Sequence, residues 1–506
     1  MAHHRMRIGF PIPGTYALGA AQGPFSLTGL DAVLSIGTGS GVVYSWDLLS
    51  PFAYVDPAKT ASGTGTFVDP YSPTQGLAIG PASSGDRVIE WLPGDCSVTT
   101  VSSAGPRFAA LAPISGASAT RRVIHRARNP GNTTAGTRTR IRRTSGAGVI
   151  FGFLNNSYAI WDGFMVDTKS GAPEVDNPQN PIWGEVGQMS CWNSNNCKFI
   201  RIYSDHQNAT YDQGDRNNIF IQTCSFIEIG DCVFRNLANS GGSGFTNLSM
   251  LMWYNSDNLD VHHNLFEAGA CGIWCKGQTA ADSVHTHDYH HNKFRNLGVA
   301  VRVSSPIQTT TARAVRVRQN QIYNCTVGVA VTAFQPGEPK GILVVNNTIY
   351  NGISYLNFDQ YGTQPRAFLV TDADGATFVA NSNITFRNNA CYNIQEMVHL
   401  RQNDSQFDAL TWDYNAYNTY TNFWRVGEGG PVSNLSTWQA EDPPRDFHVV
   451  TGSPNFVDIA NNNITPNTGS PLINAGIDVL NIRGNGTSGP CNIGASVLSN
   501  DSFGPR

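Results

Sequence analysis

The stretch Val261-His-His-Asn-Leu-Phe266 decides the fold, because its pattern returns three times further along the chain. The later copies are Tyr289-His-His-Asn-Lys-Phe294, Val317-Arg-Gln-Asn-Gln-Ile322 and Val344-Val-Asn-Asn-Thr-Ile349. The intervals are 28, 28 and 27 residues between the successive asparagines Asn264, Asn292, Asn320 and Asn347. A period of this length indicates a structural unit that stacks on the next copy of itself.

Each copy leads into a short apolar run of strand length, as in Cys271-Gly-Ile-Trp-Cys275 and Val327-Gly-Val-Ala-Val331. The repeat is rich in Asn, Val, Thr and Gly and lacks helical periodicity, which excludes helix-pair repeats. Short strands between Gly and Asn corners are typical of a β-solenoid, in which equivalent residues stack about 4.8 Å apart. Asparagine suits such a corner because it tolerates left-handed backbone geometry and its amide can bond to the next coil. We therefore expect the four asparagines to lie in one line along the axis.

With these features the chain resembles the right-handed parallel β-helix superfamily of pectate lyases, other polysaccharide lyases and phage tailspikes. The resemblance implies an all-β, right-handed, single-stranded parallel β-helix. The segment Gly85-Asp-Arg-Val-Ile-Glu-Trp-Leu-Pro-Gly94 resembles the opening of such β-helices. The segment Gly469-Ser-Pro-Leu-Ile-Asn-Ala-Gly476 resembles the part that closes them. We predict an N-terminal attachment leader at 1–50, an N-terminal cap with the first coils at 51–150, the parallel β-helix at 151–425 and C-terminal closing coils at 426–506.

Length and composition agree with one long solenoid. At 506 residues the chain exceeds the usual size of a single domain, but a solenoid grows by adding coils. Charged residues make up 14% of the chain, which fits tightly turned β structure and argues against helical bundles. No apolar run approaches the roughly 18 residues of a membrane span. Most of the ten cysteines stand in apolar runs, so we expect buried thiols and no zinc site.

Nine arginines and no acidic residue occur between Cys96 and Trp161. Such a segment can present a basic surface to an acidic polysaccharide or to a docking partner. The alternation within Arg138-Thr-Arg-Ile-Arg-Arg143 favours the simpler hypothesis of a solvated outward face on the first coils. Nucleic acid is not an expected partner, because no aromatic interleaving accompanies the arginines.

The phrase Gly23-Pro-Phe-Ser-Leu-Thr-Gly-Leu-Asp-Ala-Val-Leu34 resembles one found near the start of phage and prophage structural proteins. The first twenty residues are broken by Pro and Gly and make a poor secretory signal. The resemblance implies an N-terminal segment that binds other virion proteins, and a homotrimer, because phage spikes with this fold usually associate in that way.

Three functional hypotheses follow. The first is a spike on a virion or phage-like particle that recognises, and can cleave, a polysaccharide of the host surface or capsule. The alternative is a free polysaccharide lyase or glycoside hydrolase that acts on an acidic polysaccharide in the extracellular or periplasmic space. The third is a structural virion component without enzymatic activity. The fold does not choose among them, since it hosts lyases, hydrolases and binding spikes.

Lys276 and Arg302 are the candidate catalytic residues. Setting Asn264 over Asn292 places Arg302 over Trp274 and Lys276 over Ser304, so both basic side chains project from one face, where we expect them at the surface. Elimination requires a base beside a uronate carboxylate and an acid at the leaving oxygen. The pair resembles the Lys base and Arg acid of lyases of the alginate lyase and chondroitinase B type, although the residues that follow it depart from their pattern.

Candidate substrate-binding residues are Trp253, Tyr254 and Trp274, together with His263 and His291 from the repeated histidine pairs. Aromatic faces beside polar donors are typical of sugar sites. Stacked histidines can share a metal ion, but solenoids also stack identical side chains without a ligand, and we assign no metal to them. No cofactor is predicted, and Asp372-Ala-Asp-Gly375 is a fragment of a calcium-loop pattern that leaves Ca²⁺ open.

Overall fold

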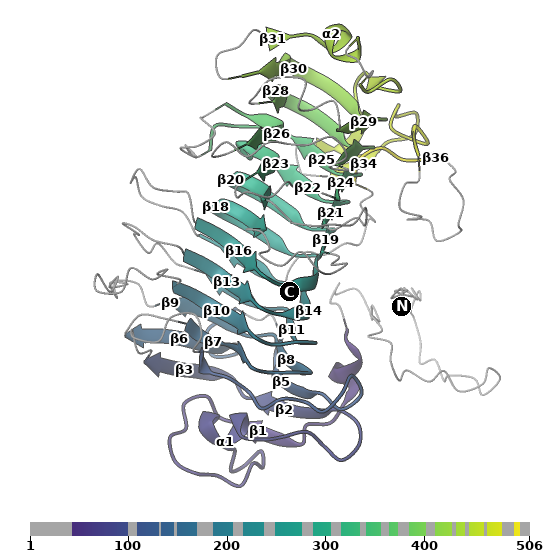
Figure 1. Cartoon of the computed structure of the whole chain (residues 1–506). Coiled ribbons are helices and arrows are strands. Elements are labelled where there is room, and N and C mark those ends of the chain that lie inside the picture. Colours follow the sequence, from purple (N-terminus) through teal and green to yellow (C-terminus); the bar gives the residue numbers. More distant parts are fainter. Residues whose placement is uncertain are drawn as a thin grey trace, which may run out of the picture.

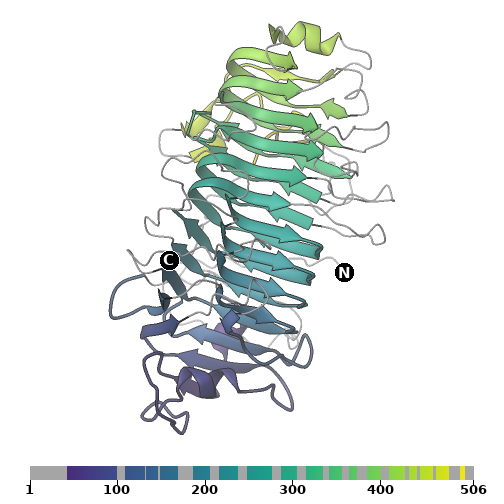
Figure 2. The ribbon, with the colours of Figure 1, turned by 60° about the vertical axis from the view of Figure 1, so that its left-hand side comes forward.

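The computed structural model describes residues 43–99, 109–130, 133–145, 149–168, 186–205, 216–236, 248–275, 287–304, 315–333, 341–355, 364–372, 384–400, 410–427, 432–440, 445–459, 463–477 and 490–495. These residues form a right-handed parallel β-helix, a stack of coils whose strands pair in parallel with the coils before and after (Figure 1). Viewed from a second side, the same strands lie in layers along the whole length of the molecule (Figure 2). Each full coil contributes a strand to each of three faces, numbered here in chain order.

Face 1 is a 12-stranded sheet. Its strands are β1 (Ala53–Val55), β2 (Arg87–Trp91), β5 (Val123–Ala127), β8 (Ala159–Asp162), β11 (Lys198–Ile200), β14 (Ser225–Gly230), β17 (Asp257–His262), β19 (His287–His290), β21 (Val315–Arg318), β24 (Ile342–Val345), β27 (Thr385–Arg387) and β29 (Thr411–Asp413).

Faces 2 and 3 belong to one 20-stranded sheet that bends between them. Face 2 contains β3 (Gly94–Thr99), β6 (Thr139–Ser145), β9 (Met165–Thr168), β12 (Tyr203–Asp205), β15 (Val233–Arg235), β22 (Gln321–Tyr323) and β25 (Thr348–Tyr350). Face 3 contains β4 (Ala109–Leu111), β7 (Val149–Leu154), β10 (Val186–Trp192), β13 (Arg216–Gln222), β16 (Leu248–Tyr254), β23 (Val327–Ala333) and β26 (Arg366–Asp372). Long strands run through both faces: β18 (Leu265–Cys275), β20 (Lys293–Ser304), β28 (Ala390–Leu400) and β30 (Ala416–Val426).

The corner between faces 1 and 2 holds the asparagine ladder that the repeat predicts. The Nδ2 of Asn264 donates to Oδ1 of Asn292 at 3.0 Å, and the same bond joins Asn292 to Asn320 at 3.1 Å and Asn320 to Asn347 at 3.0 Å. The ladder continues through Asn389 and Asn415, with bonds of 3.0 Å from Asn347 and from Asn389. The predicted line is therefore confirmed and is longer than the four copies indicate.

One part of the corner prediction is wrong. The left-handed residue is the one before each ladder asparagine, as in His263, His291 and Gln319, each with a φ of 54°. The ladder asparagine itself points into the interior, where its backbone N–H and its Nδ2 both donate to the Oδ1 of the next asparagine. These hydrogen bonds can continue from coil to coil because each side-chain amide carries both a donor and an acceptor.

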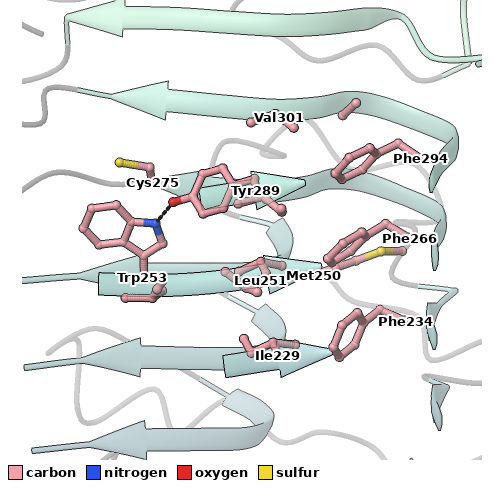
Figure 3. Packing of buried hydrophobic residues seen from close by; sticks show 14 of the residues in the cluster. Ile229, Phe234, Met250, Leu251, Trp253, Phe266, Cys275, Tyr289, Phe294 and Val301 are labelled. Atoms are coloured by element: carbon pink, nitrogen blue, oxygen red, sulfur yellow. Dashed lines mark hydrogen bonds between the residues drawn. The ribbon is translucent and has the colours of Figure 1, made fainter. Parts of the chain in front are cut away.

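The core runs along the axis inside the three faces. Phenylalanines of face 2 stack on successive coils, with 5.1 Å between the ring centroids of Phe234 and Phe266 and 4.9 Å between those of Phe266 and Phe294 (Figure 3). Trp253 crosses the interior and donates its indole N–H to the Tyr289 hydroxyl. All ten cysteines are free and buried, as expected from their apolar surroundings.

The arginines of the first coils do not form an isolated basic surface. Arg122 lies 2.6 Å from Asp86, and Arg126 lies 2.9 Å from Glu90 on the preceding coil. Arg142 pairs at 2.6 Å with Asp167 on the following coil. The acidic partners flank the arginine-rich segment in the sequence, and stacking brings the two signs of charge together.

Both ends of the described chain pack on the outside of the solenoid. Residues of η1 (Ser45–Leu48) lie against face 1, where Trp46 donates to Asp162 at 2.7 Å and Asp47 pairs with Arg201 at 2.7 Å. The remaining elements are α1 (Pro73–Leu77), β31 (Val432–Ser433), α2 (Leu435–Gln439), β32 (Val450–Thr451), β33 (Phe456–Asp458), β34 (Asn463–Pro466), β35 (Gly476–Ile477) and β36 (Pro490–Cys491). Residues 1–42, with the phage-like phrase, lie outside the described residues. Among the helices that the structure does describe, none has the length and apolar character needed to span a bilayer.

Candidate functional site

Face 3 is the face at which the coils differ most from one another. Only Asp231 and Cys232 separate β14 from β15 at the first corner, whereas 236–247 separate β15 from β16 and 276–286 separate β18 from β19. The long segments thus enter or leave face 3. Insertions in a repeat protein gather on one face, which is often the binding face. The outward side of face 3 is therefore the place at which binding chemistry is expected.

One outward column of face 3 changes from apolar to charged along the axis. Strand pairing aligns eight residues on successive coils: Phe220, Met252, Trp274, Arg302, Ala330, Leu369, His399 and Arg425. The register places Arg302 beside Trp274, as the repeat predicts. The charged end of the column lies on β28 and β30.

The predicted catalytic pair is only half described. Lys276 lies outside the described residues, so its role stays a prediction. Arg302 is 1% exposed, and its guanidinium lies 4.4 Å from the centroid of the Trp274 ring. The expectation that Arg302 stands at the surface is therefore wrong, because its side chain packs on Trp274 in a column whose neighbouring members are also buried.

The predicted substrate-binding residues lie in three different places. Trp253 is in the core, and Trp274 is buried on face 3 with its indole N–H donating to the Ser304 hydroxyl at 3.1 Å. Tyr254 is half-buried at the end of β16. His263 is buried and His291 half-buried at the corner between faces 1 and 2, away from face 3. The structure does not bring the five side chains into one site, and their sugar-binding role stays a prediction.

A compact charged cluster lies at the other end of the column. Glu396 of β28 accepts two hydrogen bonds. The Nε–H of Arg366 donates to its Oε2 at 2.8 Å, and the Nε–H of Arg425 donates to its Oε1 at 2.8 Å. The arginines come from β26 and β30, so three successive coils build the cluster. The Nδ1 of His399 lies 3.3 Å from Oε2 of Glu396. We call these four residues the Glu396 cluster.

The Glu396 cluster is buried and carries excess positive charge. Glu396 is 0% exposed, Arg366 5% and Arg425 16%, so the cluster opens to solvent at Arg425. Burial alone would raise the pKa of Glu396, but His399, Arg366 and Arg425 outweigh it and lower that pKa to about 2. Two guanidiniums around one carboxylate give a net charge of +1 before His399 is counted.

His399 is the buried imidazole of the cluster. Its side chain is 1% exposed, its Nδ1 contacts Glu396 at 3.3 Å, and its Nε2 has no hydrogen-bond partner within the described part of the chain. Buried polar groups are normally hydrogen-bonded, so this Nε2 beside two guanidiniums is a place at which a polar ligand would be stabilised. The cluster therefore places an imidazole next to a pair of arginines that can bind an anion.

Sequence reasoning missed this cluster, although a signal was present. His399 interrupts the apolar run Met397-Val-His-Leu400 and Glu396 directly precedes it, and a charge buried with such a run must be paired. The partners Arg366 and Arg425 lie about 30 residues away on either side, and only the register of the coils brings them to Glu396.

No group of three or more His, Cys, Asp or Glu side chains in the described ranges is arranged to hold a metal ion. The calcium-like fragment is outside this statement, because 373–383 are not among the described residues.

No family model and no curated protein matches the sequence. Among solved structures, the chain is similar to the pectate lyase Pel9A, with 15% identity, a TM-score of 0.46, and coverage of 88% of this chain and 96% of that one. It is similar to a family 6 polysaccharide lyase from Pseudopedobacter saltans, with 11% identity, a TM-score of 0.40, and coverage of 86% and 97%. It is also similar to an exopolygalacturonase from Thermotoga maritima, with 9% identity, a TM-score of 0.40, and coverage of 73% and 84%. These likenesses concern the pectate lyase-like arrangement of coils and not the chemistry of face 3.

Proposed function

We propose that the protein binds an acidic polysaccharide on face 3 and cleaves it by elimination at the Glu396 cluster. The observation that carries the proposal is the buried imidazole of His399, whose Nε2 has no hydrogen-bond partner among the described residues, beside the two arginines that Glu396 holds. The insertions at the edges of the same face support it, since repeat proteins place binding segments there.

The chemistry follows from the charges. A uronate carboxylate that approaches from Arg425 would meet the two guanidiniums, which stabilise the enolate that forms when the neighbouring C–H is deprotonated. His399 is the proposed base. It takes that proton, the bond from carbon to the glycosidic oxygen breaks as the carbon–carbon double bond forms, and the proton passes from the imidazole to the leaving oxygen. No other reactant is required.

Glu396 itself does not suit glycoside hydrolysis. A hydrolase needs two carboxyl groups at about 5 to 10 Å, one of which donates a proton. The pKa of Glu396, held at about 2 by the surrounding cations against the opposing effect of burial, leaves it without a proton to donate at neutral pH.

The particle hypothesis is separate from this chemistry. A spike would use the same face toward a host polysaccharide, but its attachment and its trimeric state depend on residues 1–42 and on partner chains, which the described residues do not include. Both stay predictions, and so does the location of the protein.

The deciding experiment incubates the purified chain with alginate, polygalacturonate and chondroitin sulfate and follows the absorbance of the new double bond. We expect cleavage of at least one polymer, and a loss of about 10² to 10⁴ in rate for His399→Ala, as is typical for removal of an acid–base group. Arg295→Ala on face 2 is the matched control and should retain the parent rate. New reducing ends without a double bond would contradict elimination, and full activity of His399→Ala would remove His399 from the mechanism.

A further inference from the structure

The repeated histidine pairs form a second cluster on face 1, far from the Glu396 cluster in the sequence. In the first unit, Nε2 of His262 lies 3.1 Å from Oε1 of Glu228, and Nδ1 of His262 lies 3.2 Å from Nδ1 of His263. In the second unit, one coil later, Nε2 of His290 lies 3.0 Å from Oδ1 of Asp260, and Nδ1 of His290 lies 2.8 Å from Nδ1 of His291. Each unit is a carboxylate, a strand histidine and a corner histidine.

The register of face 1 explains why the two units have the same geometry. Glu228 pairs with Asp260, and Asp260 with Asp288, while His262 pairs with His290. Each strand histidine therefore reaches back to the carboxylate of the preceding coil. The ring of His262 fits because Gly230 lies below it, where a Cβ would stand 2.4 Å from Cε1 of His262.

The contact between two Nδ1 atoms restricts the protons of each unit. Next to a carboxylate, the strand histidine presents its Nε2–H, so the neutral ring has a bare Nδ1 that must accept from Nδ1–H of the corner histidine. If the strand histidine gains a proton, its Nδ1–H becomes the donor and the corner histidine must carry its proton on Nε2. A proton on both Nδ1 atoms would place two donors face to face, which the 2.8 Å and 3.2 Å contacts do not permit.

The next coil shows the charged form of the same unit. Arg318 takes the place of the strand histidine and donates from Nε to Oδ1 and from its terminal nitrogen to Oδ2 of Asp288, both at 2.8 Å. It also donates to Oε1 of Gln319, the corner residue, at 2.9 Å. A permanent cation thus bonds a carboxylate on one side and a corner acceptor on the other.

We propose that Glu228–His262–His263 and Asp260–His290–His291 are two proton-binding sites, each of which takes up one proton and then has the charge pattern of Asp288–Arg318–Gln319. The uptake keeps the fold of the coil, reverses the tautomer of the corner histidine and changes the net charge of each unit from −1 to 0. A second proton on a unit separates the two rings.

Charged groups flank the two histidine units on the preceding and on the following coil. Lys198 of β11 lies 2.9 Å from Glu228, and Asp231 at the corner of the preceding coil receives the hydroxyl of Tyr44. On the other side Asp288 is held by Arg318, and Arg316 of β21 pairs in register with Asp288. Burial lowers the pKa of His290 although Asp260 opposes the shift, which keeps the His290 ring neutral at neutral pH.

The first test is the protonation of the four rings in the parent protein, measured by ¹⁵N NMR of histidine-labelled chain. At pH 8 we expect His262 and His290 to carry the proton on Nε2, and His263 and His291 to carry it on Nδ1, the less common tautomer in water. On acidification each pair should gain one proton as a unit. Four imidazoles that titrate independently, or corner histidines with Nε2–H at pH 8, would overturn the proposal.

The second test replaces the two histidines of each unit with the residue types that the next coil has at the equivalent positions. The double substitutions His262→Arg with His263→Gln, and His290→Arg with His291→Gln, supply the permanent cation and the corner acceptor. Each should remove the uptake of about one proton per chain from the potentiometric titration while circular dichroism stays that of the parent. An unchanged proton uptake in a folded double variant would contradict the assignment, and the tautomer measurement decides the matter for a variant that does not fold.

Discussion

Two Arg–Glu–Arg stacks stand on different faces of the same solenoid. On face 2, Glu267 lies between Arg235 and Arg295, whose side chains are 36% and 32% exposed, and the stack also bonds the hydroxyls of Tyr203 and Tyr323. On face 3, Glu396 lies between Arg366 and Arg425, which are 5% and 16% exposed. The same three residue types on three successive coils thus meet two different environments.

The difference separates a structural use of charge from a chemical one. The two stacks differ in burial and in their neighbours. On face 2 the arginines are about a third exposed, and three buried atoms of the ion-paired side chains, Nε of Arg235, Oε2 of Glu267 and Nε of Arg295, make no hydrogen bond among the described residues. The face 3 stack is more deeply buried, has His399 beside Glu396 and lies where the long connections gather. Repetition of coils therefore explains the fold, and the deeper burial with an adjacent imidazole distinguishes the face 3 stack.

The sharpest stability test of this comparison removes each central carboxylate. Glu396→Ala removes the buried carboxylate that bonds both Arg366 and Arg425 and should lower the free energy of unfolding by about 3 to 5 kcal/mol. Glu267→Ala, in the more exposed stack, should lower it by about 0 to 1 kcal/mol. Urea denaturation followed by tryptophan fluorescence measures both values. Equal losses in the two variants would mean that burial does not distinguish the stacks.

The same contrast can be made with asparagines. Asn320→Ala removes the acceptor of Asn292 and the donor to Asn347 inside the ladder, where every atom is buried, and should cost roughly 2 to 4 kcal/mol. Asn324→Ala, at the half-buried corner between faces 2 and 3, loses one 3.3 Å bond to Asn296 and should cost about 1 kcal/mol. Chemical denaturation of the two variants gives the difference, and a milder effect at Asn320 than at Asn324 would refute the role of the ladder.

A third comparison uses pH. Asp446 ends the ladder and accepts from Asn415, Tyr417 and Trp438, but burial outweighs these bonds and raises its pKa to about 6. A raised pKa means that the folded state binds the proton more tightly, so this contribution is full below about pH 4 and is lost as pH rises to 6. Glu396, with its pKa near 2, loses its contribution in the opposite direction, as pH falls below about 4.5.

Asp446→Asn should therefore gain stability relative to the parent by about 2 kcal/mol between pH 4 and 6. Glu396→Gln should show a deficit that shrinks as the pH falls from about 4.5 toward 2. Thermal unfolding at a series of pH values follows both variants. Difference curves with the same slope would show that the two buried carboxyl groups are not held in opposite ways.

The sequence predicts the part of this molecule that repeats. The Asn264 pattern predicts the coil, the corner and the register of Arg302 on Trp274, because one residue type performs one task on each coil. The regular interval ends at Asn347, since an insertion lengthens the next interval to 42 residues, and Thr385-Phe-Arg-Asn-Asn389 is recognisable only as a weaker coil. The repeat also assigns left-handed backbone geometry to the ladder asparagine, one position after the residue that adopts it. Asparagine suits either position, because it tolerates a positive φ and can also form the amide ladder.

The site escaped prediction for a physical reason. Exposure depends on the outer surroundings of a coil, and the strand pattern gives only the side to which a residue points, so the pattern alone places Arg302 at the surface. Glu396 becomes chemically distinctive only through Arg366 and Arg425, whose contact requires the register of three coils. A charge within an apolar strand was the one local sign.

The central claim is that acidic polysaccharide binds at face 3 and not at the similar stack on face 2. Affinity electrophoresis of Arg425→Ala and Arg295→Ala through gels with polygalacturonate or alginate tests it directly, because both substitutions remove one arginine from an Arg–Glu–Arg stack and change the net charge equally. We expect the parent and Arg295→Ala to be retarded by the polymer, and Arg425→Ala to lose most of that retardation. Retardation that survives Arg425→Ala and disappears in Arg295→Ala would contradict the account.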